Sequence, residues 1–138
     1  MIPLQNTKSL SPLVIASGAT SATTTGVIDT LGYDYAIIDT IGDTQTTGMT
    51  VCSLLEGTAS ATVTTAIAAF TSTTGYDLPA TNGTTAPIIR FNVDLRKRKR
   101  YLKLTVTRGI TGILAAHCVL GRGDQTPSAN VAGATVTG

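Results

Sequence analysis

The chain has 138 residues and a mass of 14.1 kDa, which suits one compact domain and leaves too little chain for two separate cores. Charged residues make up only 13% of the sequence, whereas threonine alone occupies 27 positions and glutamate, lysine and glutamine are scarce. This composition excludes a helical bundle and favours β-strands that have one hydrated face.

The net charge of +2 hides an asymmetry along the chain. Residues 1–89 contain one base and six acids, whereas residues 90–138 contain nine bases and two acids. If both halves belong to one domain, their opposite charges either meet inside it or face different partners. The second arrangement is the more informative one, because in a symmetric oligomer it allows the basic portion of one subunit to face the acidic portion of the next in a ring.

Apolar residues recur with a period of two in about eight segments, which are separated by Gly, Pro, Asn, Asp or threonine-rich stretches. The predicted strands are Pro12–Ala16, Thr24–Thr30, Tyr35–Ile41, Met49–Glu56, Ala61–Phe70, Ile88–Leu95, Arg100–Thr107 and Gly112–Leu120. Ala61–Phe70 is also compatible with a short helix because of its alanines, but its threonine and valine content favours a strand.

Two of these strands are separated by a very short connection. Ile88–Leu95 and Arg100–Thr107 each alternate apolar and polar residues, and only residues 96–99 lie between them. A connection of this length predicts a hairpin tip and hence antiparallel neighbours, although it lacks the Asn-Gly or Asp-Gly pair that is typical of tight hairpins.

The last predicted strand, Gly112–Leu120, is apolar at almost every position except His117. A strand without alternation is expected to have both faces covered, either in the interior of a sheet or at a contact between subunits.

Together these features predict an all-β protein: a single-domain antiparallel β-sandwich or jelly roll of about eight strands. The predicted sandwich spans residues 12–121. Residues 1–11 and 122–138 are small, polar and weakly patterned, so we expect extended N- and C-terminal arms.

Residues suited to catalysis are few. His117 lies in an apolar run, and its neighbour Cys118 would point to the opposite face of a strand, so the two do not make a nucleophile–base pair. Asp29, Asp34, Asp39 and Asp43 fit solvated turns better than a calcium site. We therefore predict no enzymatic activity, no catalytic residue, no cofactor and no metal.

The two cysteines, Cys52 and Cys118, lack the paired spacing of a zinc site. Both fall on predicted strands with apolar neighbours, so we expect buried free thiols in a reducing compartment.

A run of five cations is the strongest local signal, and it predicts a protein interface. It consists of Arg96, Lys97, Arg98, Lys99 and Arg100. Such a run is a solvated hairpin tip, a contact to an acidic protein surface or a contact to nucleic acid phosphates. Only Tyr101 adjoins it as an aromatic residue for base stacking, which favours protein contact over direct nucleic acid binding. No apolar stretch is long enough to span a membrane.

The strings TTTGVIDTLGYDYAIIDTIG and RKRKRYLKLTVTRGITGILAAHCVLG resemble capsid decoration (cement) proteins of tailed bacteriophages, over about residues 20–122. The resemblance implies a β-sandwich or jelly-roll body, assembly as a homotrimer, and binding to the major capsid protein on the virion surface after synthesis in the host cytoplasm. Such a protein stabilises the shell by bridging neighbouring capsomers. The alternatives are a head-completion or tail component, and a β-sandwich adhesion or carbohydrate-binding module on the virion surface.

Overall fold

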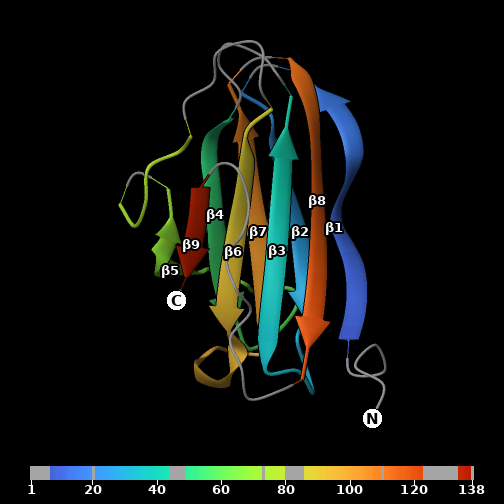
Figure 1. Cartoon of the computed structure of the whole chain (residues 1–138), viewed down its shortest axis with the longest axis vertical. Helices are drawn as coiled ribbons and strands as arrows, with labels where there is room; N and C mark the ends of the chain where they lie inside the picture. Colours follow the sequence, from blue (N-terminus) through green and yellow to red (C-terminus); the bar gives the residue numbers. More distant parts are fainter. Residues whose placement is uncertain are drawn as a thin grey trace.

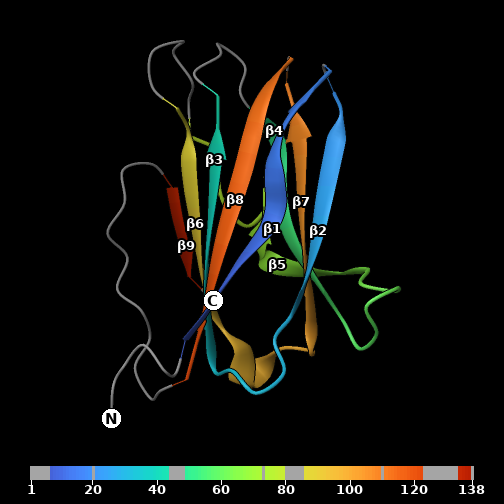
Figure 2. The ribbon, with the colours of Figure 1, turned by 90° about the vertical axis from the view of Figure 1, so that its right-hand side faces the viewer.

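The structure is a computed structural model that describes residues 7–19, 21–43, 49–72, 74–79, 86–109, 111–122 and 134–137, with the backbone alone at 14–18 and 134–137. Within these ranges nine strands form two sheets, and the only helical element is one short 3-10 turn. The sheets pack face to face as a sandwich, seen along its edge in Figure 2. All strand pairs are antiparallel except β6 with β9. The predicted all-β antiparallel sandwich is confirmed.

The two sheets differ in size, as Figure 1 shows. The five-stranded sheet has the order β1 (Thr7–Gly18), β8 (Gly112–Gly121), β3 (Tyr35–Gly42), β6 (Ile88–Asp94), β9 (Ala134–Thr137). The four-stranded sheet has the order β2 (Thr23–Asp29), β7 (Tyr101–Arg108), β4 (Met49–Gly57), β5 (Thr65–Thr71). Each of the eight predicted strands has a counterpart in the structure. Of the segment that was also compatible with a helix, residues 65–70 belong to β5, whereas residues 61–64 precede the strand as turn and loop.

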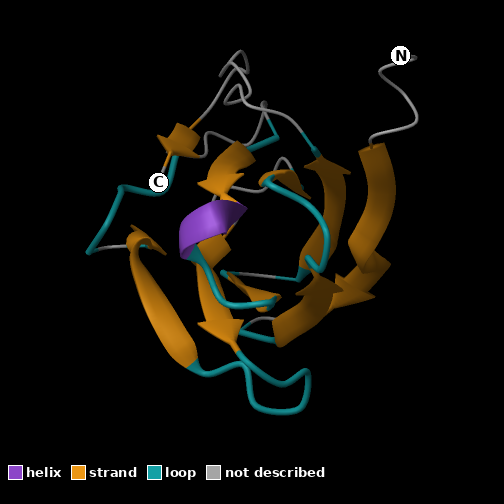
Figure 3. Cartoon of the chain, turned by 90° about the horizontal axis from the view of Figure 1, so that it is seen from below, coloured by secondary structure: helices purple, strands orange, loops and turns teal. Residues whose placement is uncertain are grey.

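The predicted hairpin between Ile88–Leu95 and Arg100–Thr107 is wrong. β6 and β7 lie in different sheets, and the 3-10 turn η2 (Leu95–Lys97) crosses from one to the other at the end of the sandwich, as Figure 3 shows. Leu95 is buried in the core and its amide donates to Asp34 O at 2.8 Å, which draws the chain inward where a hairpin tip would point outward. Strands that pair within one sheet and strands that face each other across the sandwich both alternate apolar and polar residues. This pattern therefore could not distinguish a hairpin from a crossing between the sheets.

Parts of both expected arms are strands. β1 begins at Thr7 and pairs with β8, and β9 adds to the edge of the five-stranded sheet in parallel with β6. Backbone pairing extends these strands beyond the apolar alternation from which the domain boundaries were predicted. The remainder of the predicted arms, residues 1–6, 123–133 and 138, lies outside the described residues.

The sandwich is closed on one side by a close approach of β1 and β2. A Cβ atom on Gly26 would lie 1.9 Å from Pro12 O, so no side chain fits at this position of β2. Glycine therefore allows the edges of the two sheets to meet.

The interior between the sheets is apolar and includes an aromatic cluster. Phe70 of β5 and Phe91 of β6 make an edge-to-face contact with their ring centroids 5.5 Å apart, and Tyr76 packs on Phe91 at 5.7 Å. Phe91 and Phe70 come from different sheets, so the cluster joins the two layers. The largest fully buried aliphatic side chains of the core are Leu13, Ile28, Ile38, Leu54, Ile89, Leu102, Leu104 and Leu120.

Candidate functional site

The five predicted interface cations lie at one end of the sandwich. Asp94 accepts a hydrogen bond from the Arg96 amide and caps η2, and the chain then runs through Arg98 and Lys99 into β7. Around this segment lie the turn between β2 and β3, the end of β4 and the end of β8. We call this region the basic end, and its charged residues are Lys8, Asp29, Asp34, Glu56, Asp94, Arg96, Lys97, Arg98, Lys99, Arg100, Lys103 and Arg122.

Two of the five cations are paired with carboxylates of the same chain. Arg96 makes a bidentate contact with Asp94, with both N–O distances at 2.9 Å, and Arg100 makes one with Asp29 at 2.9 and 2.7 Å. The hydrogen bonds from Arg100 lower the pKa of Asp29 from 3.8 to about 2. These two arginines therefore stabilise the fold at this end and are not free for a partner.

The other three cations have different surroundings. Lys97 is exposed, and Arg98 lies over the Phe70 ring at 5.9 Å. The Lys99 Nζ donates to Thr65 Oγ1 at 3.1 Å, and its backbone amide donates to a carboxylate oxygen of Glu56 at 3.1 Å. Packing and hydrogen bonds thus fix Arg98 and Lys99, while Lys97 projects into solvent.

Counting its charged residues shows that the basic end is only partly neutralised. Among the described residues at this end, eight cations face four acids, which leaves an excess of four positive charges on a chain whose net charge is +2. The chain's own acids therefore balance half of the positive charge at this end, and the remaining positive charge can attract an anionic partner.

Two ion pairs among the described residues join the acidic and basic halves of the sequence. Asp29 pairs with Arg100, and Asp39 of β3 makes a bidentate pair with Arg90 of β6 at 2.6 and 2.8 Å. For these four residues the first of the two arrangements holds, because their opposite charges meet inside the domain.

The histidine and the cysteine next to it lie on opposite sides of β8. His117 is exposed on the outer side of β8, whereas Cys118 is buried on the inner side, as the strand geometry predicted. Cys52 and Cys118 are both free and buried, and burial raises their pKa values to about 11 and about 12. Protonated thiols at neutral pH are poor nucleophiles.

The four aspartates that were weighed as a calcium site do not gather at one place. Asp34 and Asp43 flank the eight-residue strand β3, so they are about 30 Å apart along it. Asp29 and Asp39 each pair with an arginine. Within the described ranges, no three His, Cys, Asp or Glu side chains lie close enough together to hold a metal ion.

A second surface was not predicted as a site: the outer face of the five-stranded sheet. Most outward positions of β8 and β3 are apolar, and Ile88 of the neighbouring β6 adds to them, whereas Arg90 and Asn92 of β6 are polar. We call the apolar set the isoleucine face. It consists of Ile37, Ile41, Ile88, Ile113, Ala115 and Val119. Ile41 and Ile113 are 43% and 49% exposed. The missing alternation in Gly112–Leu120 was the sequence signal for this surface, because the outer positions of β8 are as apolar as the inner ones.

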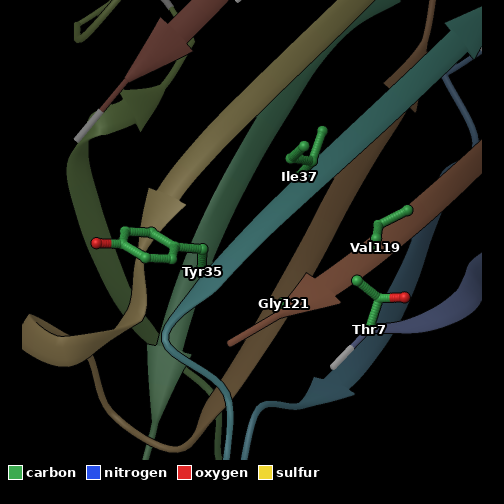
Figure 4. Close-up of a pocket in the computed structure, with 5 residues that line it drawn as sticks. All are labelled: Thr7, Tyr35, Ile37, Val119 and Gly121. Carbon is green, nitrogen blue, oxygen red and sulfur yellow. The ribbon is translucent and has the colours of Figure 1, made fainter. Parts of the chain in front are cut away.

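Cross-strand pairing places one polar row across the isoleucine face. His117, Asp39 and Arg90 are neighbours on β8, β3 and β6, and the Asp39 and Arg90 side chains are each 20% exposed. A shallow hollow of about 150 Å³ lies beyond Ile37 and Val119, where Tyr35, Thr7 and Gly121 complete its lining (Figure 4). Its volume is below the range of about 300 to 1,000 Å³ that is usual for small-molecule sites.

Comparisons with protein-family models, with curated proteins and with solved structures found no match to this chain. In the part of the chain that the structure describes, no helix has the length and apolar character needed to cross a membrane.

Proposed function

We propose that the chain is a structural virion protein that binds the outside of an assembled bacteriophage capsid and stabilises it by bridging neighbouring capsomers. The main support is the basic end, where an excess of four positive charges remains after the acids of the same region are counted. Such a surface attracts a negatively charged partner, and on a capsid this partner is an acidic patch of the major capsid protein.

The cations of the basic end are held on a rigid base, which favours binding. Leu95 anchors η2 in the core, and Arg98 lies against Phe70 of the four-stranded sheet. A backbone segment anchored in this way loses little conformational freedom when its side chains meet a partner.

The surroundings of the tyrosines favour a protein partner over nucleic acid. At the basic end, Tyr33, Tyr35 and Tyr101 each have an arginine of the same chain over the ring, at 5.4, 5.0 and 4.9 Å. A ring face covered in this way is not open to a base, and stacking is the main source of affinity for single strands.

In this proposal the protein stabilises the shell by mass action. A clamp that binds only the assembled lattice adds its binding free energy to that of the assembled state. Several weak contacts made by one clamp multiply in effect, because the second contact forms at a high local concentration.

The proposal is tested by measuring the copy number of the chain in purified particles of the virus that encodes it. We expect a fixed ratio to the major capsid protein, and a capsid protein that unfolds at lower temperature in particles from which the chain is absent. A chain absent from the particles would contradict the proposal.

A charge variant tests the role of the basic end. Lys97 and Lys103 have no ion pair among the described residues, so K97Q with K103Q removes two charges without exposing a carboxylate. We expect a large loss of capsid occupancy at physiological salt. The control is T23E with T50E, which makes the same change in net charge at exposed positions of the opposite end and should bind like the wild type. Equal occupancy of the two variants would remove the basic end from the interface.

A further inference from the structure

The isoleucine face leaves apolar side chains of interior strands uncovered. β8 and β3 lie inside the five-stranded sheet, yet Ile113 and Ile41 on their outer sides are 49% and 43% exposed. The sequence of β8 is that of a strand covered on both faces, and within the described chain only its inner face is covered by the other sheet. On one side of the polar row, Ile41 has Ile88 and Ala115 as its cross-strand neighbours. An apolar patch of this kind marks an interaction site.

We propose that the isoleucine face binds the same face of a second copy of this chain. The occupant is indicated by charge. Between Ile37 and Ile41 of β3 the face has one cation and one anion, Arg90 and Asp39, and these are joined by two short hydrogen bonds. The face is thus neutral, so it suits the equally neutral face of a second copy. An acidic or basic partner would need an unpaired opposite charge on this face, and Arg90 and Asp39 already neutralise each other.

The contact is isologous, because the same surface serves both copies, and it closes as a pair. This differs from the homotrimer implied by the resemblance, since a ring of three requires two different surfaces on each copy. Two sheets that stack in this way lie about 10 Å apart with their strands rotated by about 30°. The contact does not involve the basic end, so this inference does not depend on the proposed function.

The size of the face determines the strength of the pair. Three strand widths of about 4.8 Å and seven residues at about 3.4 Å each enclose on the order of 340 Å² in each copy. Two copies therefore bury about 700 Å², which is below the range of about 1,200 to 2,000 Å² for stable complexes. We expect a weak pair that forms only where copies are concentrated.

Sedimentation velocity of the purified chain, from about 10 µM to about 1 mM, tests the inference. We expect the wild type to shift from one copy to two across this range, and to associate more strongly in sulfate, because burial of apolar surface is strengthened by that salt. Contacts of the basic end would weaken as salt rises, so the salt dependence separates the two surfaces.

Matched lysine variants identify the surface. I41K places an unpaired charge in the contact and should raise the dissociation constant at least about tenfold. V27K makes the same change on the outer side of β2, where Val27 is 45% exposed, and should associate like the wild type. I113K on β8 is a second test of the face, and equal melting temperatures of all three variants establish that they fold.

Three results would overturn the inference: a wild type that stays a single copy at all concentrations, equal weakening by I41K and V27K, or a three-copy species that survives I41K. Each of these is separate from capsid occupancy, so failure here leaves the proposed function to its own test.

Discussion

The outer faces of the two sheets are built on the same alternation but carry different residues. The four-stranded sheet presents Thr23 and Thr25 of β2 beside Thr107 and Thr105 of β7, and the Thr23 and Thr107 hydroxyls lie 2.8 Å apart. The five-stranded sheet presents isoleucines at the equivalent positions of its central strands. Threonine and isoleucine have the same branching and similar strand propensity, so the difference between the faces lies in hydration and not in backbone preference. One face is suited to water, and the other to a partner.

The strongest test of this difference is to make the same substitution on the inner and the outer side of one strand. Ile38 is fully buried and Ile41 is 43% exposed, and both belong to β3. We expect I38T to lower the free energy of unfolding by about 3 kcal/mol, because it removes buried apolar volume and places a hydroxyl in the core.

The matched variant I41T should change the free energy of unfolding by less than about 0.5 kcal/mol while weakening self-association. Urea denaturation of both variants, at a concentration where the wild type is a single copy, provides the measurement. Similar losses in I38T and I41T would mean that the isoleucine face is covered within the subunit.

The two buried thiols allow the interior beneath one sheet to be compared with the interior beneath the other. Cys52 lies under the four-stranded sheet and Cys118 under the five-stranded sheet, and burial raises their pKa values from 9.0 to about 11 and about 12. Above pH 9 the unfolded chain loses these protons while the folded chain keeps them, so the free energy of unfolding falls as pH rises.

We expect C52A and C118A each to reduce this fall by about 1 kcal/mol between pH 9 and pH 10. Thermal denaturation at both pH values checks the effect. An unchanged slope in either variant would show that the corresponding thiol is open to solvent in the folded chain.

The smallest effect concerns the ion pair at the margin of the threonine-rich sheet. Hydrogen bonds from Arg100 lower the pKa of Asp29 from 3.8 to about 2. Between these values the unfolded chain binds more protons than the folded one, so the pair's contribution is present above about pH 4 and is lost as pH falls towards 2.

Both side chains of this pair are 44% exposed, so solvent screening keeps its contribution to stability small. The free energy of unfolding of D29N should fall less than that of the wild type between pH 4 and pH 2, with the difference reduced in high salt. A steeper fall in D29N would contradict this role for Asp29.

Much of the fold could be predicted because it depends on local patterns. The strand from Tyr35 was placed correctly because a short run rich in β-branched residues follows a glycine-containing turn. The exclusion of a pair between His117 and Cys118 also needed only the two-residue repeat of a strand.

The pairing of strands could not be predicted in the same way. β6 and β7 are neighbours in sequence, but Leu95 is buried and sends the chain across to the other sheet. β9 joins β6 through backbone hydrogen bonds, which leave no periodic trace in four residues. The bidentate pairs of Arg100 with Asp29 and of Arg96 with Asp94 were likewise hidden in a run of five cations.

The amino-acid sequence by itself determined that this chain is all-β, where its main strands lie, and that residues 90–138 are rich in cations. These properties follow from side-chain periodicity and composition, which act over a few residues. Only the tertiary structure decided which strands pair, which cations are neutralised and which apolar residues remain exposed. Those outcomes depend on contacts between residues far apart in the sequence, and such contacts are set by how the two sheets pack around a common core.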